Sequence, residues 1–375
     1  MKKKILIVFG TRPEAIKMAP LVKMFLSHSD EIETRVCVTA QHRQMLDQVL
    51  DFFGIKPDYD LDLMKEQQTL NSITAKILME LKPILDEYKP DYVFVHGDTT
   101  TSTASALAAY YSFCKVAHVE AGLRTWDKQA PYPEELNRQL TARIADIHFA
   151  PTIQARDNLL KEGIRNENVI ITGNTVIDAL FESLTLLKEH SLEEIDNLKR
   201  MLSVDKEIIL VTGHRRENFG QGFVNICEAL KRLALNNSSV EIIYPVHLNP
   251  SVQQPVKDIL SGIKNIKLIS PLSYPAFVWL MEKSKLIITD SGGVQEEAPS
   301  LGKPVLVMRN VTERPEAVNA GTVVLVGTDV EKIVFEAQRL LDNEQLYKQM
   351  TSIRNPYGDG NASRKIVEFI LNDKR

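Results

Sequence analysis

Cysteine is scarce in this sequence of 375 residues: Cys37, Cys114 and Cys227 lie far apart, without a C-x-x-C spacing. The sequence therefore predicts neither a disulfide framework nor a cysteine-bound zinc site. The net charge is only −4, which gives no reason to expect a nucleic-acid partner. No apolar run is long enough to span a bilayer, so we expect no membrane-spanning segment.

The first residues resemble the start of a signal peptide, because Met1–Lys4 is basic and Ile5–Phe9 is apolar. That apolar run is too short for a signal peptide and meets residues 10–13 (GTRP), so it predicts a first β-strand instead. Apolar residues make up 44% of the chain and charged residues 25%, the balance of a soluble globular protein. We therefore expect a cytoplasmic protein.

Several motifs of cofactor and metal chemistry are absent. No G-x-G-x-x-G follows the first strand, and neither G-x-x-x-x-G-K-[ST] nor H-E-x-x-H occurs. Their absence argues against a tightly held dinucleotide of the usual kind. We expect neither a resident cofactor nor a metal.

Short apolar runs alternate with longer amphipathic ones, which predicts parallel, doubly wound α/β sheets. In the first half the predicted strands are Ile5–Phe9, Thr34–Thr39, Tyr92–His96, Val116–Glu120, Ile147–Ala150 and Val169–Ile171. The predicted helices between them are Pro13–Ser27, His42–Phe53, Leu70–Tyr88, Ser102–Phe113, Glu134–Ala145 and Asn174–His190. In the second half the predicted strands are Ile208–Thr212, Val240–Val246, Ile266–Ile269, Leu286–Thr289, Pro304–Met308 and Val323–Val326.

The polar run Ser191–Arg200 interrupts this alternation and is the best candidate for a domain boundary. We predict a Rossmann-like domain over residues 1–190 and a second one over residues 191–360. A C-terminal helix over residues 361–375 could pack back on the first domain. The natural architecture is two domains that face a cleft.

The stretch Leu286–Glu316 organises the second half of the chain. A buried-type strand, Leu286–Thr289, ends in residues 290–293 (DSGG), after which a helix is expected to open at Val294. Glycines allow backbone amides to approach a ligand, and a helix N-terminus favours anions, so the turn suits a phosphate. Glu297 could cap the helix or bind ribose hydroxyls. An ordinary strand–turn–helix would show the same spacing, and spacing alone does not separate the two interpretations.

Charged residues also follow other predicted strands. In open parallel sheets the ligand binds beyond the carboxyl ends of the strands. A lone Asp there is more often a helix cap, and a lone His more often structural. Their accumulation at the same sheet edges favours a site in which cations bind two phosphates and carboxylates lie at a reacting carbon. The strand-end residues are Arg12, Lys17, Asp98, Glu120, His214, Arg215, His247 and Asp290.

These motifs together resemble a known family, and the resemblance covers essentially the whole chain. The motifs are GTRPEAIKMAP, TAQHRQMLDQVL, HGDTTT, HVEAGLRT, PYPEELNRQLT, TGNTVIDAL, GHRREN, YPVHLNP, TDSGGVQEEAPSLGKPVLV, TERPEAV and NPYGDG. They are similar to those of the non-hydrolysing bacterial UDP-N-acetylglucosamine 2-epimerases. The resemblance implies a glycosyltransferase-B-like fold, a homodimer, and interconversion of UDP-N-acetylglucosamine and UDP-N-acetylmannosamine for cell-surface polysaccharide synthesis.

The resemblance also implies roles for individual residues. Phe277 and the backbone of Leu272 match the uracil pocket, and Glu297 matches the ribose-binding carboxylate. The remaining matches are Ser291, Gly292 and Gly293 for the diphosphate loop, Arg12, Lys17, His214 and Arg314 for the cationic ligands, and Asp98, Glu120 and Glu134 for the catalytic carboxylates, beside which His214 could also act in catalysis.

Some members of the resembled family bind a second substrate molecule that activates them. The matching positions here are Gln41, Gln44, Glu134, Arg215 and His247. Gln67 stands where those members carry an arginine, and an amide cannot supply the forked, charged contact of a guanidinium to phosphate. We therefore expect a weaker second site.

The chemistry of such a reaction follows from the substrate. The proton on C2 of the sugar is not acidic, because no carbonyl is adjacent. Anti elimination of UDP from C1 would remove that proton and leave a 2-acetamidoglucal, and re-addition with protonation on the other face inverts C2. Cations stabilise the leaving group and carboxylates move the protons. The alternatives are a UDP-sugar glycosyltransferase of the same fold and a nucleotide-sugar-binding protein without turnover.

Overall fold

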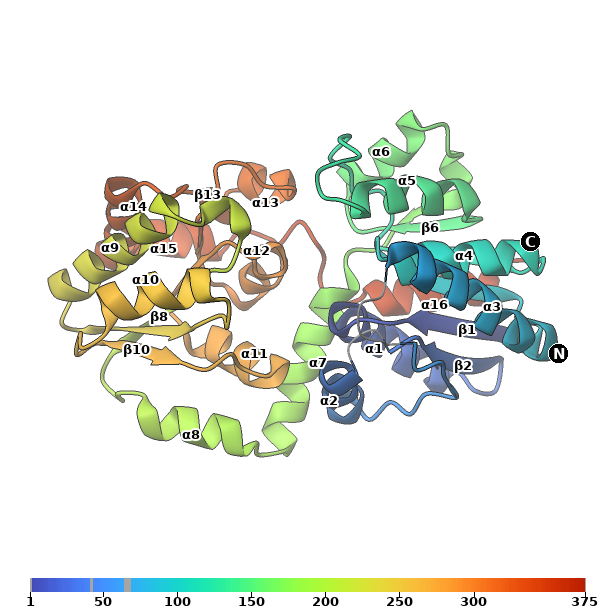
Figure 1. Cartoon of the computed structure of the whole chain (residues 1–375), viewed down its shortest axis with the longest axis horizontal. Helices are drawn as coiled ribbons and strands as arrows, with labels where there is room; N and C mark the ends of the chain where they lie inside the picture. Colours follow the sequence, from blue (N-terminus) through green and yellow to red (C-terminus); the bar gives the residue numbers. More distant parts are fainter. Residues whose placement is uncertain (1, 41–42, 64–68, 375) are drawn as a thin grey trace. The chain divides into compact units, whose positions relative to one another are not determined.

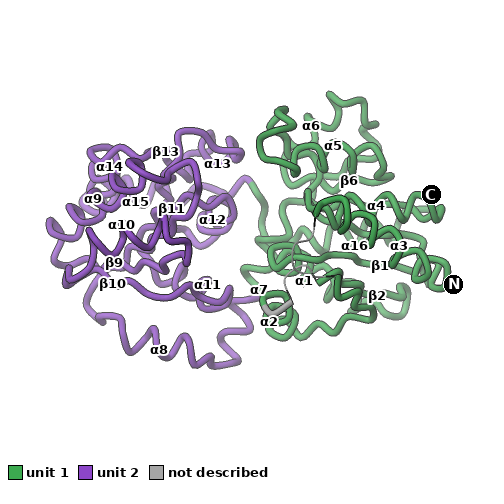
Figure 2. Tube along the Cα trace, viewed as in Figure 1, with its two compact units in different colours: residues 1–182, 357–375 green, residues 183–356 purple. Residues whose placement is uncertain are grey.

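The computed structural model describes residues 2–40, 43–63 and 69–374 (Figure 1). Contacts divide the chain into two compact units (Figure 2). Unit 1 comprises Met1–Glu182 and Tyr357–Arg375, and unit 2 comprises Ser183–Pro356. Because the chain returns to unit 1 after completing unit 2, unit 1 is assembled from two separate stretches of sequence.

Unit 1 is built on a parallel sheet with the strand order β3-β2-β1-β4-β5-β6-β7. Residues Ile5–Phe9 of β1 are fully buried, as expected for a strand that helices cover on both faces. The strands are β1 Lys3–Phe9, β2 Ile32–Val38, β3 Tyr59–Asp60, β4 Tyr92–His96, β5 Lys115–Val119, β6 Ile147–Ala150 and β7 Val169–Ile171.

The helices of unit 1 connect these strands, and the last of them comes from the C-terminus. In Figure 1 the red helix α16 lies among the blue and green elements, where Asp178 accepts hydrogen bonds from the backbone N–H groups of Ala362 (3.1 Å) and Ser363 (2.8 Å). The helices are α1 Arg12–Ser27, α2 Arg43–Phe53, α3 Leu70–Tyr88, α4 Thr100–Tyr111, α5 Glu134–Ile144, α6 Ile153–Lys161, α7 Thr175–Glu189, which continues into unit 2, and α16 Ala362–Asn372.

Unit 2 repeats the same design with a parallel sheet in the order β10-β9-β8-β11-β12-β13. Its strands are β8 Glu207–Thr212, β9 Val240–Pro245, β10 Ile266–Ile269, β11 Leu286–Thr289, β12 Val305–Val307 and β13 Val323–Leu325. Its helices are α8 Glu193–Met201, α9 Gln221–Asn236, α10 Pro250–Leu260, α11 Tyr274–Lys283, α12 Gly292–Glu297, α13 Pro315–Ala320, α14 Val330–Asp342 and α15 Glu344–Thr351. The predicted doubly wound α/β class is confirmed in both units.

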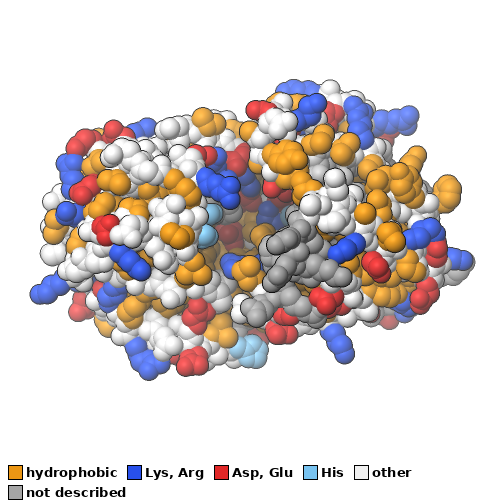
Figure 3. All heavy atoms as spheres, in the orientation of Figure 1, with side chains coloured by type: hydrophobic (Ala, Val, Ile, Leu, Met, Phe, Trp, Pro, Cys, Tyr) orange, Lys and Arg blue, Asp and Glu red, His pale blue; other side chains and the backbone are white. Residues whose placement is uncertain are grey.

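The polar run Ser191–Arg200 contains helix α8. The helix buries Ile195 and Leu198 against Ala276 of α11, so a narrow apolar stripe holds an otherwise charged segment on unit 2. No helix in the described part of the chain has the length and apolar character to cross a membrane. Acidic and basic side chains intermingle on the face shown in Figure 3, in keeping with the small net charge.

Candidate active site

Each sheet contains a point at which the strand order reverses. In unit 1 the chain builds outward from β1 through β2 and β3, then restarts at β4 on the other side of β1. In unit 2 the same reversal separates β8 from β11. Ligands of open α/β sheets bind at such switch points, beyond the carboxyl ends of the strands. The turns after β1, β4, β8 and β11 therefore define the candidate site in each unit.

Glu120 follows β5 in a strained conformation, with a φ of 60° that residues other than glycine rarely adopt. Its side chain is only 6% exposed and forms an ion pair with Lys17. The Glu120 Oε2 atom, which faces Lys17, accepts a hydrogen bond from Asn174 Nδ2 (2.7 Å) and lies 3.9 Å from His96 Nε2. Lys17, predicted as a cationic ligand, is thus also the ionic partner of a predicted catalytic carboxylate.

Asp98 follows β4 and is held from α5. The Nε and Nη2 atoms of Arg138 both donate to Asp98 Oδ2, at 2.9 and 2.7 Å. Asn137 Nδ2 donates to the backbone oxygen of Asp98 (2.9 Å), and Arg138 also binds Glu135 (3.1 Å). These hydrogen bonds fix the orientation of the Asp98 side chain. It remains accessible, because it is 25% exposed.

Glu134 begins α5, one helical turn before Arg138. Its Oε2 atom is buried and accepts no hydrogen bond from the described part of the chain. A buried carboxylate oxygen without a partner is unusual and calls for an explanation. Arg138 joins α5, which begins at Glu134, to the turn that carries Asp98, and Glu120 follows β5, the neighbour of β4.

Arg12 is the first residue of α1, directly after the N-cap Thr11 at the end of β1. It is half-buried, and the adjacent strand β4 carries Asp98 at the corresponding end. The turn after β1 thus supplies a cation beside the turn that supplies a carboxylate.

In unit 2 a wholly buried carboxylate, Asp290, ties two turns together. Its Oδ2 atom accepts hydrogen bonds from the backbone N–H groups of His214 and Arg215, both in the turn after β8 and each at 2.8 Å. Asp290 Oδ1 lies 3.4 Å from His214 Nδ1, and the His214 ring stacks on His247 with centroids 5.5 Å apart. Burial lowers the pKa of His214, although the Asp290 charge opposes that effect. The imidazole is therefore mostly neutral at pH 7.

The glycine turn after β11 opens α12 at Gly292, before the predicted opening at Val294. A Cβ atom on Gly292 would lie 2.9 Å from Arg314 Cζ, so only glycine lets this guanidinium rest on the turn. Arg314 Nε also donates to Glu296 Oε1 (2.8 Å). The Arg314 guanidinium thus lies against the turn formed by Ser291, Gly292 and Gly293.

The residues matched to the uridine part of the ligand lie on α11, on α12 and, for Leu272, just before α11. Glu297 accepts a hydrogen bond from the Tyr274 hydroxyl (2.7 Å) and is 6% exposed. Phe277 is partly buried on the first turns of α11, and Leu272 packs against the small cluster that anchors α8. The structure places these residues in one unit with the glycine turn.

Guanidinium groups gather around Glu313. Arg309 forms an ion pair with Glu313. The Oε1 atom of Glu313 lies 3.7 Å from Arg215 and 3.6 Å from Arg314. Burial raises the pKa of Glu313, but the arginines outweigh burial and bring the pKa down to about 2. Arg309 also donates to Glu217 (2.6 Å), so charged contacts link the turns after β8 and β12.

The predicted second-ligand residues are only partly described. Gln41 and Gln67 lie outside the described residues, and so does the side chain of Gln44. The structure places Arg215 beside Glu313 and His247 against His214.

The sequence reasoning missed Asn174, His96 and Arg138 as partners of the carboxylates, and the role of Asp290. Asn174 and His96 belong to the motifs TGNT and HGD, which stand at strand ends and could have predicted that both residues lie at the carboxyl edge of the sheet. Asp290 directly follows a buried strand, which is also such a signal. Arg138 lies within a helix, where nothing in the local pattern sets it apart.

The chain thus has two doubly wound α/β units, as in a glycosyltransferase-B-like fold, with Asp98 and Glu120 after adjacent strands of one unit and a glycine turn after β11 in the other. A family model described as UDP-N-acetylglucosamine 2-epimerase matches residues 25–371. The chain belongs to this family, as its motifs predicted.

Individual relatives agree over the full length of the chain. A UDP-N-acetylglucosamine 2-epimerase from Campylobacter jejuni is 57% identical, with 100% of this chain and 99% of that protein covered. One from Escherichia coli K12 is 56% identical, with 99% of each covered. A crystal structure of the enzyme from Neisseria meningitidis bound to UDP-GlcNAc superimposes with a TM-score of 0.91 at 51% identity, covering 99% of this chain and 100% of that one.

Proposed function

We propose that this chain catalyses the reversible epimerisation of UDP-N-acetylglucosamine to UDP-N-acetylmannosamine at C2, through elimination of UDP and its re-addition. The observation that carries the proposal is the match of residues 25–371 to the epimerase family, and it is supported by Asp98 and Glu120, which follow the adjacent strands β4 and β5 beside the switch point of unit 1. The Neisseria meningitidis relative was solved with UDP-GlcNAc, and a Methanocaldococcus jannaschii relative, 34% identical, with UDP-GlcNAc and UDP. The product would supply cell-surface polysaccharide synthesis from the cytoplasm.

Unit 2 is assigned the uridine diphosphate. The backbone amides of Ser291–Gly293 and the Arg314 guanidinium above them suit the diphosphate, since both favour the charge that grows as UDP departs. Glu297 is assigned to accept a hydrogen bond from a ribose hydroxyl. Phe277 and the backbone of Leu272 are assigned to uracil.

Unit 1 is assigned the proton transfers. Inversion at C2 requires groups that remove a proton from one face and deliver one to the other. Asp98, Glu120 and Glu134 can divide these roles, and Glu134 carries a buried oxygen whose hydrogen-bonding capacity the described residues leave unused. Arg12 and His214 are assigned to the leaving group, and the assignment of faces to carboxylates stays open.

Incubation in deuterium oxide tests this function. UDP-N-acetylmannosamine formed from UDP-N-acetylglucosamine is expected to carry deuterium at C2, because the abstracted proton exchanges with solvent before re-addition. NMR of the C2 position measures it, without added nicotinamide or metal. Product that retains protium at C2 would rule out elimination, a sugar moved to an acceptor would favour the glycosyltransferase, and binding without exchange or turnover would favour the binding protein.

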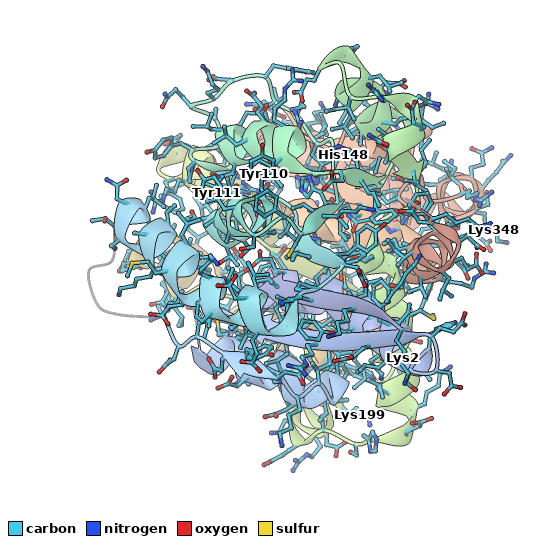
Figure 4. The ribbon with its side chains drawn as sticks, turned by 90° about the vertical axis from the view of Figure 1, so that its right-hand side faces the viewer. Lys2, Tyr110, Tyr111, His148, Lys199 and Lys348 are labelled. Atoms are coloured by element: carbon cyan, nitrogen blue, oxygen red, sulfur yellow. The ribbon has the colours of Figure 1, made fainter. Side chains whose placement is uncertain are left out.

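We further propose a homodimer that forms through an apolar face of unit 1. Met79 on α3 is 72% exposed, Tyr110 and Tyr111 at the end of α4 are about equally so (61% and 62%), and Phe113 beyond them is 99% exposed. Figure 4 shows both tyrosines on the outside of α4. Helices α3 and α4 pack against each other, so these exposed apolar side chains belong to neighbouring helices, and large exposed apolar surfaces mark protein interfaces.

Replacing Tyr111 and Phe113 by Ser together is expected to convert the dimer to a monomer, because large apolar side chains dominate such interfaces. Light scattering at micromolar concentration measures the mass. Val204→Ser, an equally exposed apolar residue of unit 2, is the control. A dimer that persists in the double variant would place the interface elsewhere.

A further inference from the structure

Glu14 is a buried carboxylate in the first turn of α1, only 2% exposed. Its Oε2 atom accepts hydrogen bonds from the backbone N–H groups of Gly10 (3.0 Å) and Thr11 (2.8 Å). The Thr11 hydroxyl in turn caps the N–H of Glu14, which completes a capping box. These bonds fix the turn between β1 and α1.

The other oxygen of Glu14 reaches a second helix. Oε1 accepts hydrogen bonds from the hydroxyls of Thr99 (2.6 Å) and Ser102 (3.2 Å). Thr99 is the N-cap of α4 and accepts the N–H of Ser102 (3.1 Å). The same carboxylate thus serves the N-termini of α1 and α4, each of which carries roughly half a positive charge.

A capping box does not require this reach. A glutamate that only capped α1 could lie at the surface. Glu14 is instead buried, which raises its pKa, and the cost of burying its carboxylate must be offset by hydrogen bonds. The bonds from Thr99 and Ser102 come from residues 85 and 88 positions later in the chain. They join the turn that carries Arg12 to the turn that carries Asp98.

We infer that Glu14 is a positioning residue of the active site: it locks the turn after β1 to the turn after β4 and thereby fixes Arg12 relative to Asp98. The inference rests on the proposed function for the roles of those two residues. Groups that act on one reacting centre must be held within a fraction of an ångström, and a misplacement of about 1 Å can lower the rate about a hundredfold.

A double-mutant cycle on turnover tests the lock. Glu14→Gln keeps the shape of the side chain but leaves an NH2 group where one oxygen accepted hydrogen bonds. We expect kcat to fall about tenfold to a hundredfold, with the Kd for UDP changed less than about threefold. Thr99→Val is expected to lower kcat as well, and the double variant to be about as slow as Glu14→Gln alone, because Thr99 acts through Glu14.

Ser105→Ala is the matched control. Ser105 is fully buried on the same helix, and its hydroxyl has no hydrogen-bond partner in the described part of the chain. Its effect on kcat is expected to be small and to multiply independently with that of Glu14→Gln. If the effects of Thr99→Val and Glu14→Gln on kcat also multiplied independently, the inference would be overturned. It would also be overturned if Glu14→Gln left kcat unchanged.

Amide hydrogen exchange provides a readout that does not depend on turnover. In Thr99→Val the backbone amides of Gly10 and Thr11 are expected to exchange faster, although they lie on the other turn. In Ser105→Ala their exchange is expected to stay unchanged. If Glu14→Gln fails to fold, this variant still tests the lock, and unchanged exchange at residues 10–11 contradicts it. If the wild-type chain does not epimerise its substrate, the proposed function fails while the exchange result stands by itself.

Discussion

Asp98→Asn, Glu120→Gln and Glu134→Gln are each expected to lower turnover by about two to four orders of magnitude, the usual scale for a lost acid–base group. Each change removes a carboxylate but keeps its size. UDP binding should survive in all three variants, because the Ser291–Gly293 turn belongs to unit 2. Initial rates by NMR and UDP titration by calorimetry separate the two effects.

The control is Glu162→Gln, which removes a carboxylate of unit 1 that is also bound to an arginine. Arg124 donates to Glu162 at 2.7 and 2.9 Å, and the side chain is 13% exposed, so its loss should reduce stability and leave turnover nearly unchanged. Near-normal rates in the three carboxylate variants would show that the site assignment is wrong.

Acidification is expected to destabilise the fold strongly, because His96, His118 and His148 are buried in neighbouring strands. Burial lowers their pKa values to about 4, 3 and 4. In the unfolded chain a histidine has a pKa near 6.5, so below that pH the unfolded state binds protons that the native state does not. Stability is therefore lost as the pH falls from about 6.5 towards 4, by roughly 3 kcal/mol at the full shift for His96 and His148 and by roughly 5 kcal/mol for His118.

Urea unfolding between pH 7.5 and pH 4.5 measures this loss. The raised pKa values of the buried carboxyls Glu14 and Asp178 act in the opposite sense and set the size of the net effect. His118→Gln should flatten the pH dependence even if it lowers stability at pH 7. His190→Gln, at an exposed position, should leave the curve unchanged. A free energy of unfolding that stays constant from pH 7 to pH 5 would contradict the prediction.

Much of the fold could be predicted because buried parallel strands are short apolar runs. Strands Tyr92–His96 and Leu286–Thr289 have the predicted bounds, and so does the helix Leu70–Tyr88. The segment of α8 escaped recognition as a helix because its apolar stripe consists of little more than Ile195 and Leu198. Strand β3 is two residues long, too short for any periodicity.

The site was predictable in position but not in its contacts. Parallel strands bring their carboxyl ends to one edge, so the residues that follow them, such as Asp98 and Glu120, gather there whatever the details. Their partners are set by side chains far away in sequence. Arg138 binds Asp98 across 40 positions, and Lys17 binds Glu120 across 103, distances over which local patterns carry no information.

The return of the chain to unit 1 has a consequence for the order in which the protein is made. Helix α16 buries Ile366, Val367 and Ile370 in unit 1, and its N-terminus satisfies the buried carboxylate of Asp178. On the ribosome these residues emerge only after every strand of unit 2. Unit 2 can therefore fold during synthesis before unit 1 is complete, although unit 1 contains the earlier part of the chain.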